Sequence, residues 1–176
     1  MPIQSLHHAA YRCKDAQKTV DFYTQVLDLE FSMAMAEDHV PSTGEFSPYM
    51  HIFFKMADGA CVAFFELPEA APMDRDRNTP EWVQHLALRV NHEDELLFYK
   101  ARLEKAGYSV IGPTDHTIFK SIYFFDPSGN RLELTVNVDA PAEIAKLTEL
   151  KDPMLKEWNI TKRPPASAAF VHKKKA

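Results

Sequence analysis

The chain has 176 residues, of which 45% are hydrophobic and 26% are charged, so it can bury one full core or two smaller halves of one. Its formal net charge is −5, and the basic residues form no stripe of the kind that neutralises phosphates, which argues against nucleic acid as a partner. No stretch is apolar for long enough to span a bilayer, and no secretory signal begins the chain. We therefore expect a cytoplasmic protein without a membrane partner.

The first half of the chain reads as a strand, a helix and a hairpin, in that order. Residues 8–12 place His, Ala and Arg at alternate positions, and this period of two indicates a strand. Asp15 then begins an amphipathic stretch whose apolar residues recur every three or four positions, which predicts a helix packed on a sheet. After a long connection over residues 33–48, a hairpin over residues 52–67 turns at an Asp-Gly pair.

The second half repeats this pattern. Residues 85–89 again place His, Ala and Arg at alternate positions, and the helix that follows has a Phe-Tyr pair at residues 98–99, as the first helix has at residues 22–23. A hairpin over residues 122–134 then turns at Asp-Pro-Ser-Gly-Asn. The repeat predicts an α+β fold in which two tandem βαβββ modules form a curved mixed sheet around a cavity.

The boundaries of these parts follow from changes in composition. We expect the first module over residues 1–68, a linker rich in Pro and Ala over 69–80, the second module over 81–138, and a C-terminal helix and extended arm over 139–176. In that last part, Asp139 can cap a short helix that begins near residue 141 and ends near residue 150. The arm carries Trp158 and Ile160, which should pack on the modules or on a partner subunit, and it ends in a frayed run of three lysines.

Two histidines and two glutamates recur at matching places in the two halves. Strand alternation puts His8 and His85 on faces opposite the apolar residues that pack on the helices. Glu133 shares that property in the second module, and Glu66 is interpreted as its match in the first. If the modules pair about a pseudo-twofold axis, these four side chains meet and bind one divalent metal ion in the cavity, which could be Fe²⁺, Mn²⁺, Ni²⁺, Co²⁺ or Zn²⁺.

Further motifs surround these candidate ligands and carry a family resemblance. They are, in order, His8 followed by Arg12 and Asp15, Phe22-Tyr23-x-x-x-Leu27, His85-x-Ala-x-Arg89, and Phe125-Asp126-Pro127-x-Gly129-Asn130-x-x-Glu133. Over roughly residues 5–137 the chain resembles the vicinal oxygen chelate superfamily of glyoxalases, bleomycin-resistance proteins and extradiol dioxygenases. The resemblance implies a metal-dependent enzyme that acts on a small molecule with neighbouring oxygens.

Lyase or isomerase chemistry of the glyoxalase type is the reaction that we favour from the sequence. In glyoxalase-like members the first hairpin supplies a fourth metal ligand, a place that Glu66 fits, and either Glu66 or Glu133 could then move the proton. Arg12 also matches an arginine that lies near the glutathione carboxylate in glyoxalase I. Ala70 and Glu81 do not match the remaining glutathione-binding positions, which argues against glutathione as the carrier.

An Fe(II) extradiol ring-cleaving dioxygenase is the alternative. In that branch of the superfamily three ligands suffice, and His8, His85 and Glu133 supply them. Tyr123 falls where these enzymes place a tyrosine near the substrate, and we include it among the candidate catalytic residues. The acid-base histidine of these enzymes is missing from its usual place before the first hairpin's second strand, and His51 on the partner strand is a possible substitute.

The remaining expectations concern the substrate and other partners. Arg12, His51 and Lys120 are candidates for binding the substrate. A homodimer is possible. A second alternative is a protein that binds a hydrophobic small molecule without metal, and the wall of its cavity would then consist of Phe53, Phe64, Phe65 and Phe119.

Overall fold

Module 1 forms one four-stranded sheet with a single helix. The computed structural model of the chain describes residues 2–74 and 76–165. The elements of module 1 are β1 (His8–Cys13), α1 (Ala16–Gln25), β2 (Glu30–His39), β3 (Phe46–Lys55) and β4 (Cys61–Glu66). The strand order is β1-β4-β3-β2, with β1 and β4 parallel and the other pairs antiparallel.

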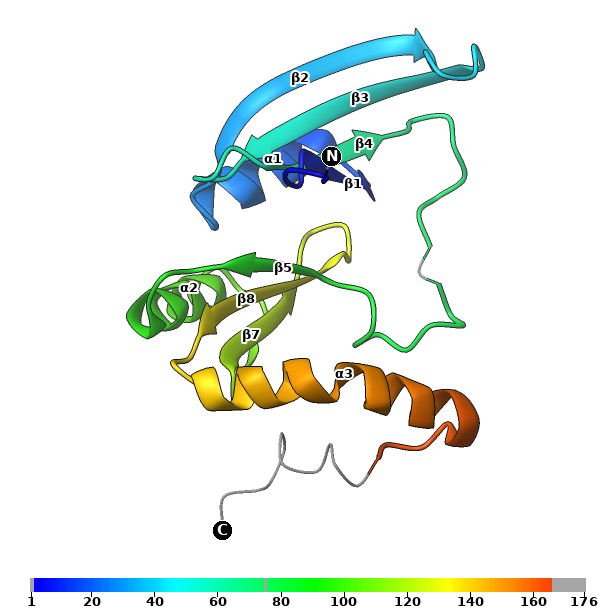
Figure 1. Ribbon diagram of the computed structural model, residues 1–176. Helices are drawn as coiled ribbons and strands as arrows, with labels where there is room; N and C mark the ends of the chain where they lie inside the picture. The colour runs from blue at the N-terminus through cyan, green and yellow to red at the C-terminus, as the bar shows by residue number, and fades with distance from the viewer. Residues whose placement is uncertain (1, 75, 166–176) are drawn as a thin grey trace.

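Module 2 repeats this topology with a sheet of its own. Its elements are β5 (Leu86–Arg89), α2 (Glu93–Lys105), β6 (Ile111–Asp115), β7 (Phe119–Phe125) and β8 (Arg131–Asn137). The strand order is β5-β8-β7-β6, and again only the outer pair β5 and β8 is parallel. The α+β fold of two tandem βαβββ modules is therefore confirmed (Figure 1), and it consists of two mixed sheets rather than one.

The long connection expected over residues 33–48 is wrong, because these residues form most of a hairpin. Strand β2 pairs with β3 along nearly its whole length and carries a β-bulge near Ser32. Every residue of β2 is exposed, so no pattern of buried residues marks it as a strand. The sequence shows only the alternation of Met33 and Met35 with alanines. Gly44 closes the turn with a φ of +74°, a conformation that glycine adopts without steric cost.

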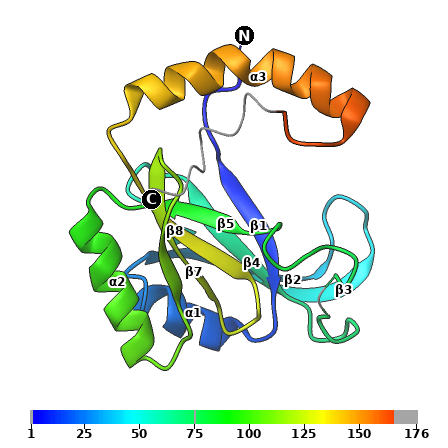
Figure 2. The same ribbon diagram turned by 90° about the horizontal axis from the view of Figure 1, so that it is seen from below.

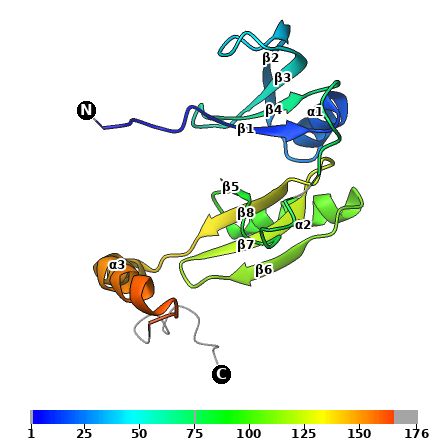
Figure 3. The same ribbon diagram turned by 90° about the vertical axis from the view of Figure 1, so that its right-hand side faces the viewer.

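The two modules pack together through the faces that carry their helices. The ring of Phe22 on α1 lies 4.9 Å from that of Tyr108 and 6.4 Å from that of Phe124, measured between centroids. The hydroxyl of Tyr23 donates a hydrogen bond of 3.2 Å to Asp126 in the β7–β8 turn. Helices α1 and α2 lie on the same side of the molecule (Figure 3). One core therefore joins the helix-bearing faces, and the opposite face of each sheet lies outside it.

The C-terminal helix is longer than expected and buries none of its residues. Helix α3 spans Pro141–Thr161 and continues through Pro153, whereas the sequence predicted an end near residue 150. The loss of one hydrogen bond at Pro153 is tolerated because the helix is exposed to water, which can satisfy the freed carbonyl. Its N-cap is Ala140, without a side-chain hydrogen bond, so the cap expected from Asp139 is also wrong.

Helix α3 lies along one side of the molecule, beside module 2 (Figures 1 and 2). Trp158 and Ile160 remain exposed, so the expected packing of these side chains on the modules of the same chain is not observed. The lysine run of the predicted arm lies outside the described residues. Within the ranges that the structure describes, no helix is both long and apolar enough to cross a membrane.

Candidate metal and substrate site

His85 and Glu133 form a pre-arranged pair on the outer face of module 2. Strand β8 places Glu133 opposite Ala87 of β5, and the chain enters β5 directly from His85. The Nε2 atom of His85 lies 2.8 Å from a carboxylate oxygen of Glu133, whose other oxygen accepts a hydrogen bond from Ser121. The Nδ1 atom of His85 lies 3.1 Å from the carbonyl oxygen of Val83, an arrangement that directs Nε2 toward the carboxylate.

The burial of Glu133 makes this pair suited to a cation. Glu133 is only 4% exposed, and a buried carboxylate is costly unless positive charge or several hydrogen bonds compensate it. Imidazole nitrogen and carboxylate oxygen are common ligands of divalent transition metals. The donor set of His85 and Glu133 therefore fits half of a metal centre.

Tyr123 lies beside this pair and is linked to a further histidine. Its strand neighbour on β8 is Glu133, and its hydroxyl lies 2.8 Å from Nε2 of His116. The Arg131 guanidinium lies over the Tyr123 ring, 4.8 Å from its centroid. Burial, followed by the nearby charge of Glu133, raises the pKa of Tyr123, so its hydroxyl stays protonated at neutral pH. Tyr123 can therefore donate a hydrogen bond at this face.

His8 and His51 form the corresponding cluster on module 1. Strand alternation puts both on the outer face of the sheet, where their ring centroids lie 6.3 Å apart. Phe53 packs beside them, with its ring 5.6 Å from His8 and 4.1 Å from His51. Burial lowers the pKa of His51, and the nearby His8 lowers it further, so the His51 imidazole is neutral at neutral pH.

Glu66 does not share this face, contrary to the match with Glu133 that the sequence suggested. In the parallel pair of module 1, Ala10 lies opposite Ala63, just as Ala87 lies opposite Glu133 in module 2. The structural counterpart of Glu133 is thus Ala63. Glu66 lies three residues further along β4, an odd number, and its side chain therefore points to the helix-bearing face. There it accepts a hydrogen bond of 2.6 Å from the backbone N–H of Ala16, at the start of α1.

Lys120 also points away from the candidate site. On β7 it alternates with Ser121, so it lies on the face that α2 covers. Its Nζ atom lies 2.7 Å from both carboxylate oxygens of Glu93, and this hydrogen-bonded ion pair raises the pKa of Lys120. Lys120 therefore stands apart from His85 and Glu133, and its binding of the substrate stays a prediction.

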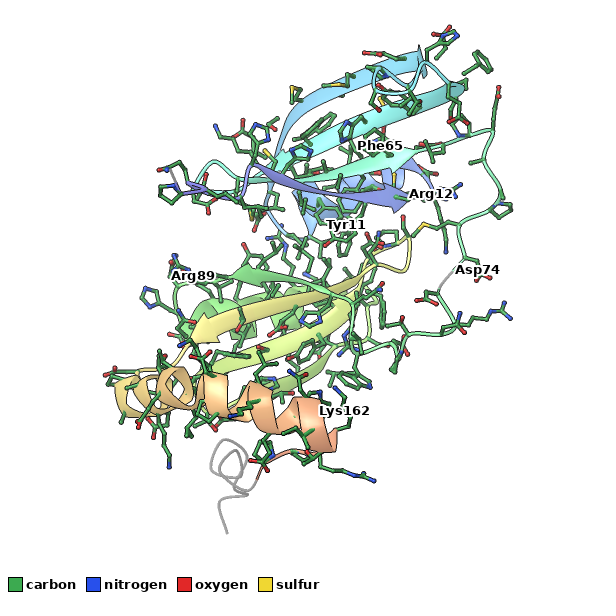
Figure 4. The ribbon with its side chains drawn as sticks, turned by 45° about the vertical axis from the view of Figure 1, so that its right-hand side comes forward. Tyr11, Arg12, Phe65, Asp74, Arg89 and Lys162 are labelled. Carbon is green, nitrogen blue, oxygen red and sulfur yellow. The ribbon has the colours of Figure 1, made fainter. Side chains whose placement is uncertain are left out.

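Arg12 is on the outer face of module 1, at the end of β1 away from His8. It lies opposite Phe65 in the register, and its Nη2 donates a hydrogen bond of 2.7 Å to the carbonyl of Ala71 in the linker. Figure 4 shows Phe65 and Tyr11 on opposite sides of the module 1 sheet, with Tyr11 toward module 2. Arg12 thus anchors the linker at the rim of the face that carries His8.

The two halves of the predicted metal site do not meet within one chain. The common core joins the helix-bearing faces, whereas His8 and the pair of His85 and Glu133 stand on the opposite faces of two different sheets. Among residues 2–74 and 76–165, no three side chains of His, Cys, Asp or Glu are close enough to hold a metal ion. The single-chain cavity around four ligands is therefore not formed.

The aromatic side chains proposed as a cavity wall divide between the faces. Phe53 and Phe65 lie beside His51 on the outer face of module 1, whereas Phe64 belongs to the core. Phe119 lies on module 2, where its ring is 4.8 Å from that of His116.

A cavity of about 780 Å³ between the modules and the linker is lined by Tyr11, Phe64 and His85 among others, and it does not include His8.

The sequence reasoning missed Ser121 and His116. Ser121 could have been found, because it precedes Tyr123 by two residues on the same strand and must share its face. His116 stands in the turn after β6, where no periodic pattern predicts the direction of a side chain.

The chain is similar to two curated proteins of different activity. Over 140 residues it is 29% identical to "Putative ring-cleaving dioxygenase MhqA" of Bacillus subtilis (strain 168), with 78% of this chain and 42% of that protein covered. The chain therefore spans less than half the length of the Bacillus protein. Over 164 residues it is 28% identical to 2-epi-5-epi-valiolone epimerase of an Actinomyces species, with 84% of this chain and 86% of that protein covered.

Solved structures share the fold. The fosfomycin resistance protein FosX of Listeria monocytogenes, in complex with Mn(II) and sulfate, is 21% identical with a TM-score of 0.56, and the match covers 78% of this chain and 96% of FosX. An integron cassette protein from the Halifax Harbour sewage outfall is 28% identical with a TM-score of 0.53, covering 76% of this chain and 99% of that one. Residues 5–134 also match the family model that unites such proteins. The chain belongs to the Glyoxalase/Bleomycin resistance protein/Dioxygenase superfamily.

Proposed function

We propose that the protein is a divalent-metal-dependent enzyme that acts on a small molecule with two neighbouring oxygen atoms. Its metal ligands are His8, His85 and Glu133. The observation that carries the proposal is the buried Glu133 carboxylate, held by Ser121 and by an imidazole that Val83 orients, on the outer face of module 2. A carboxylate and an imidazole held in this way by neighbouring groups are suited to bind a divalent metal ion together with one further ligand.

The third ligand, His8, comes from a second copy of the chain. Because the half-sites lie on outward faces, His8 of one protomer can approach His85 and Glu133 of another without disturbing the core between the modules. In a twofold-symmetric dimer this exchange happens twice and yields two identical sites. We therefore propose a homodimer in which each metal site takes one ligand from one subunit and two from the other.

The chain's own residues then supply the surroundings of the reaction. His8, His85 and Glu133 would hold the divalent ion, which would supply polarisation of the substrate oxygens and stabilisation of negative charge on them. The Tyr123 hydroxyl can donate a hydrogen bond to a substrate oxygen, and His116 beside it can accept or return the proton. The apolar residues around His51 exclude water from the opposite wall.

Ring cleavage by dioxygen is the reaction that this site supports best. The preference for a lyase rested on Glu66 as a fourth ligand or base, and Glu66 is engaged at the start of α1 on the other face of the sheet. A ligand set of two histidines and one carboxylate, as His8, His85 and Glu133 would form, is the set typical of iron(II) oxygenases. The similarity to a ring-cleaving dioxygenase agrees with this choice.

Epimerisation or a related lyase reaction is the second candidate. It is favoured by the match to the Actinomyces epimerase, which extends over 86% of that protein's length, compared with 42% for the dioxygenase. In this case Glu133 or the pair of Tyr123 and His116 would move the proton, since Glu66 lies on the opposite, helix-bearing face of its sheet.

Metal analysis tests the proposal against a metal-free binding protein. We expect about one zinc, manganese or iron per chain in the purified wild type, and less than about a tenth of that in His8→Ala and in His85→Ala, since three ligands cannot be reduced to two without a large loss of affinity. His92→Ala is the control, because His92 stands at the start of α2. Unchanged metal content in His8→Ala and His85→Ala would refute the assignment.

Oxygen uptake separates the two reactions. The iron-loaded protein should consume oxygen when it is offered catechols, and Glu66→Gln should retain this activity because Glu66 lies outside the site. Deuterium exchange at a carbon next to a carbonyl, without oxygen uptake, would instead support the epimerase or lyase.

A further inference from the structure

His51 is a buried polar side chain with an unused nitrogen. It is 7% exposed, and its Nε2 atom is enclosed and has no hydrogen-bond partner among residues 2–74 and 76–165. The imidazole is stacked on Phe65 of β4, with 3.6 Å between ring centroids, and it lies against Phe53, two residues further along β3, at 4.1 Å. A polar ring thus occupies a place that is built for an apolar one.

An arrangement of this kind lowers stability unless a ligand completes it. A neutral imidazole has one N–H and one lone pair, and a buried one that leaves either unused loses the hydrogen bond it made to water. Phenylalanine at this position would pack on Phe53 and Phe65 without that loss. Groups that remain unsatisfied in a folded protein are concentrated at functional sites, where a substrate or ion supplies the partner.

The surroundings of His51 are apolar and partly open. Its partner in the register is Met35 on β2, and Met33 lies opposite Phe53. Met33 and Met35 are 47% and 39% exposed, and their unbranched side chains can move aside to admit a flat molecule. The candidate ligand His8 stands beside this patch, with its ring 5.6 Å from that of Phe53.

We infer that His51 contacts the substrate directly, and that the substrate carries an aromatic ring. The ring lies against Phe53, Phe65 and the two methionines, and the Nε2 atom of His51 makes a hydrogen bond to one of its oxygens. This inference rests on the proposed function, because the metal held by His8 brings the oxygens of the substrate to this face. The polar face of the partner subunit's module 2 then receives the other side of the substrate.

Binding of two chelating probes to the zinc-loaded protein tests this inference without turnover, since zinc has no redox chemistry. The first probe is 4-nitrocatechol, followed by its absorbance, and the second is oxalate, which offers two neighbouring oxygens but no ring. In His51→Phe we expect the dissociation constant of 4-nitrocatechol to rise about tenfold, the value for one lost hydrogen bond in a buried site. Oxalate binding and zinc content should stay within about twofold of the wild type, a change too small to reflect a lost contact.

The melting temperature gives a second readout that a merely structural histidine would not share. His51→Phe should melt no lower than the wild type, because it removes an unsatisfied polar group and keeps the ring packing. His51→Gln, which retains a donor and an acceptor, should lose less affinity for 4-nitrocatechol than His51→Phe does. Phe65→Ser should weaken the binding of 4-nitrocatechol but not the binding of oxalate. His92→Phe is the matched control and should change the dissociation constant of neither probe.

The results separate this inference from the function on which it rests. Absence of zinc binding in the wild type would refute the proposed function and this inference together. Normal zinc and oxalate binding, with 4-nitrocatechol unaffected by His51→Phe, would overturn the inference alone. Equal weakening of both probes, or a large drop in melting temperature, would assign His51 a structural role and would overturn it as well.

Discussion

Glu66 and Glu133 carry the same carboxylate on equivalent strands, but their positions along those strands differ by an odd number of residues. Glu133 therefore faces the imidazole of His85, whereas Glu66 faces the backbone of α1. A carboxylate at the first turn of a helix accepts a free N–H and interacts favourably with the helix dipole. The role of each glutamate follows from the face on which it stands.

Because the two glutamates face different surroundings, we expect the same substitution to have different outcomes at the two positions. Glu66→Gln should lower the free energy of unfolding by about 0.5–1 kcal/mol, since it keeps an acceptor for Ala16 but loses the charge. Its metal content should match the wild type. Glu133→Gln should lose most of the metal. Urea unfolding and metal analysis of both variants measure this difference, and a large loss of metal in Glu66→Gln would contradict the assignment.

At the scale of elements, the β7–β8 turn holds the modules together. Asp126 accepts hydrogen bonds from the backbone N–H groups of Ser128 and Asn130 and from the hydroxyl of Tyr23 on α1. The same turn reaches the end of β1, where the side-chain amide of Asn130 donates to the carbonyl of Arg12. Burial raises the pKa of Asp126, in spite of these hydrogen bonds, which lower it.

This raised pKa predicts a pH dependence. The folded state binds the Asp126 proton more tightly than the unfolded state does. The stabilisation that this proton provides is fully present below the unfolded pKa of about 4, and it is lost as the pH rises through the folded pKa. The stability advantage of the wild type over Asp126→Asn should therefore shrink as the pH rises above about 4. Tyr23→Phe keeps the carboxyl but removes a hydrogen bond that lowers its pKa, so its stability should depend on pH in the same direction as the wild type's, with about 1 kcal/mol less stability. An advantage that grows with pH, measured by urea unfolding, would contradict the raised pKa.

Local patterns predicted what depends on neighbours in the chain. The repeat, the helix positions and the outward direction of His8 and His85 follow from alternation and helical spacing, and the structure agrees with them. The match of Glu66 to Glu133 depended on the register between β1 and β4, which are distant in sequence. Strand β2 and the helix through Pro153 were missed because both are exposed, and exposure leaves no pattern of buried residues.

At the scale of the whole molecule, the core between the modules determines how a complete site can form. The helix-bearing faces are joined by the contacts of Phe22 and by the ion pair between Arg102 on α2 and Asp28 after α1. Both half-sites consequently remain on the outside of one chain. A second copy can complete each of them without any rearrangement of this core, which is why we place the metal at a subunit interface.

Complementation between two inactive variants tests this central claim most directly. When His8→Ala and His85→Ala chains with different tags are produced together and purified through both tags, each mixed dimer should contain one intact site and one site without either histidine. Its zinc content should reach about half of the wild-type value, as the twofold symmetry of the exchange requires.

A mixed dimer of His85→Ala and Glu133→Gln is the matched control. Both of its sites carry a mutation on module 2, so its zinc content should stay near zero. If the dimer of His8→Ala and His85→Ala also binds no more zinc than its parents, the metal site is not shared between subunits, and the proposed ligand set across the dimer interface is wrong.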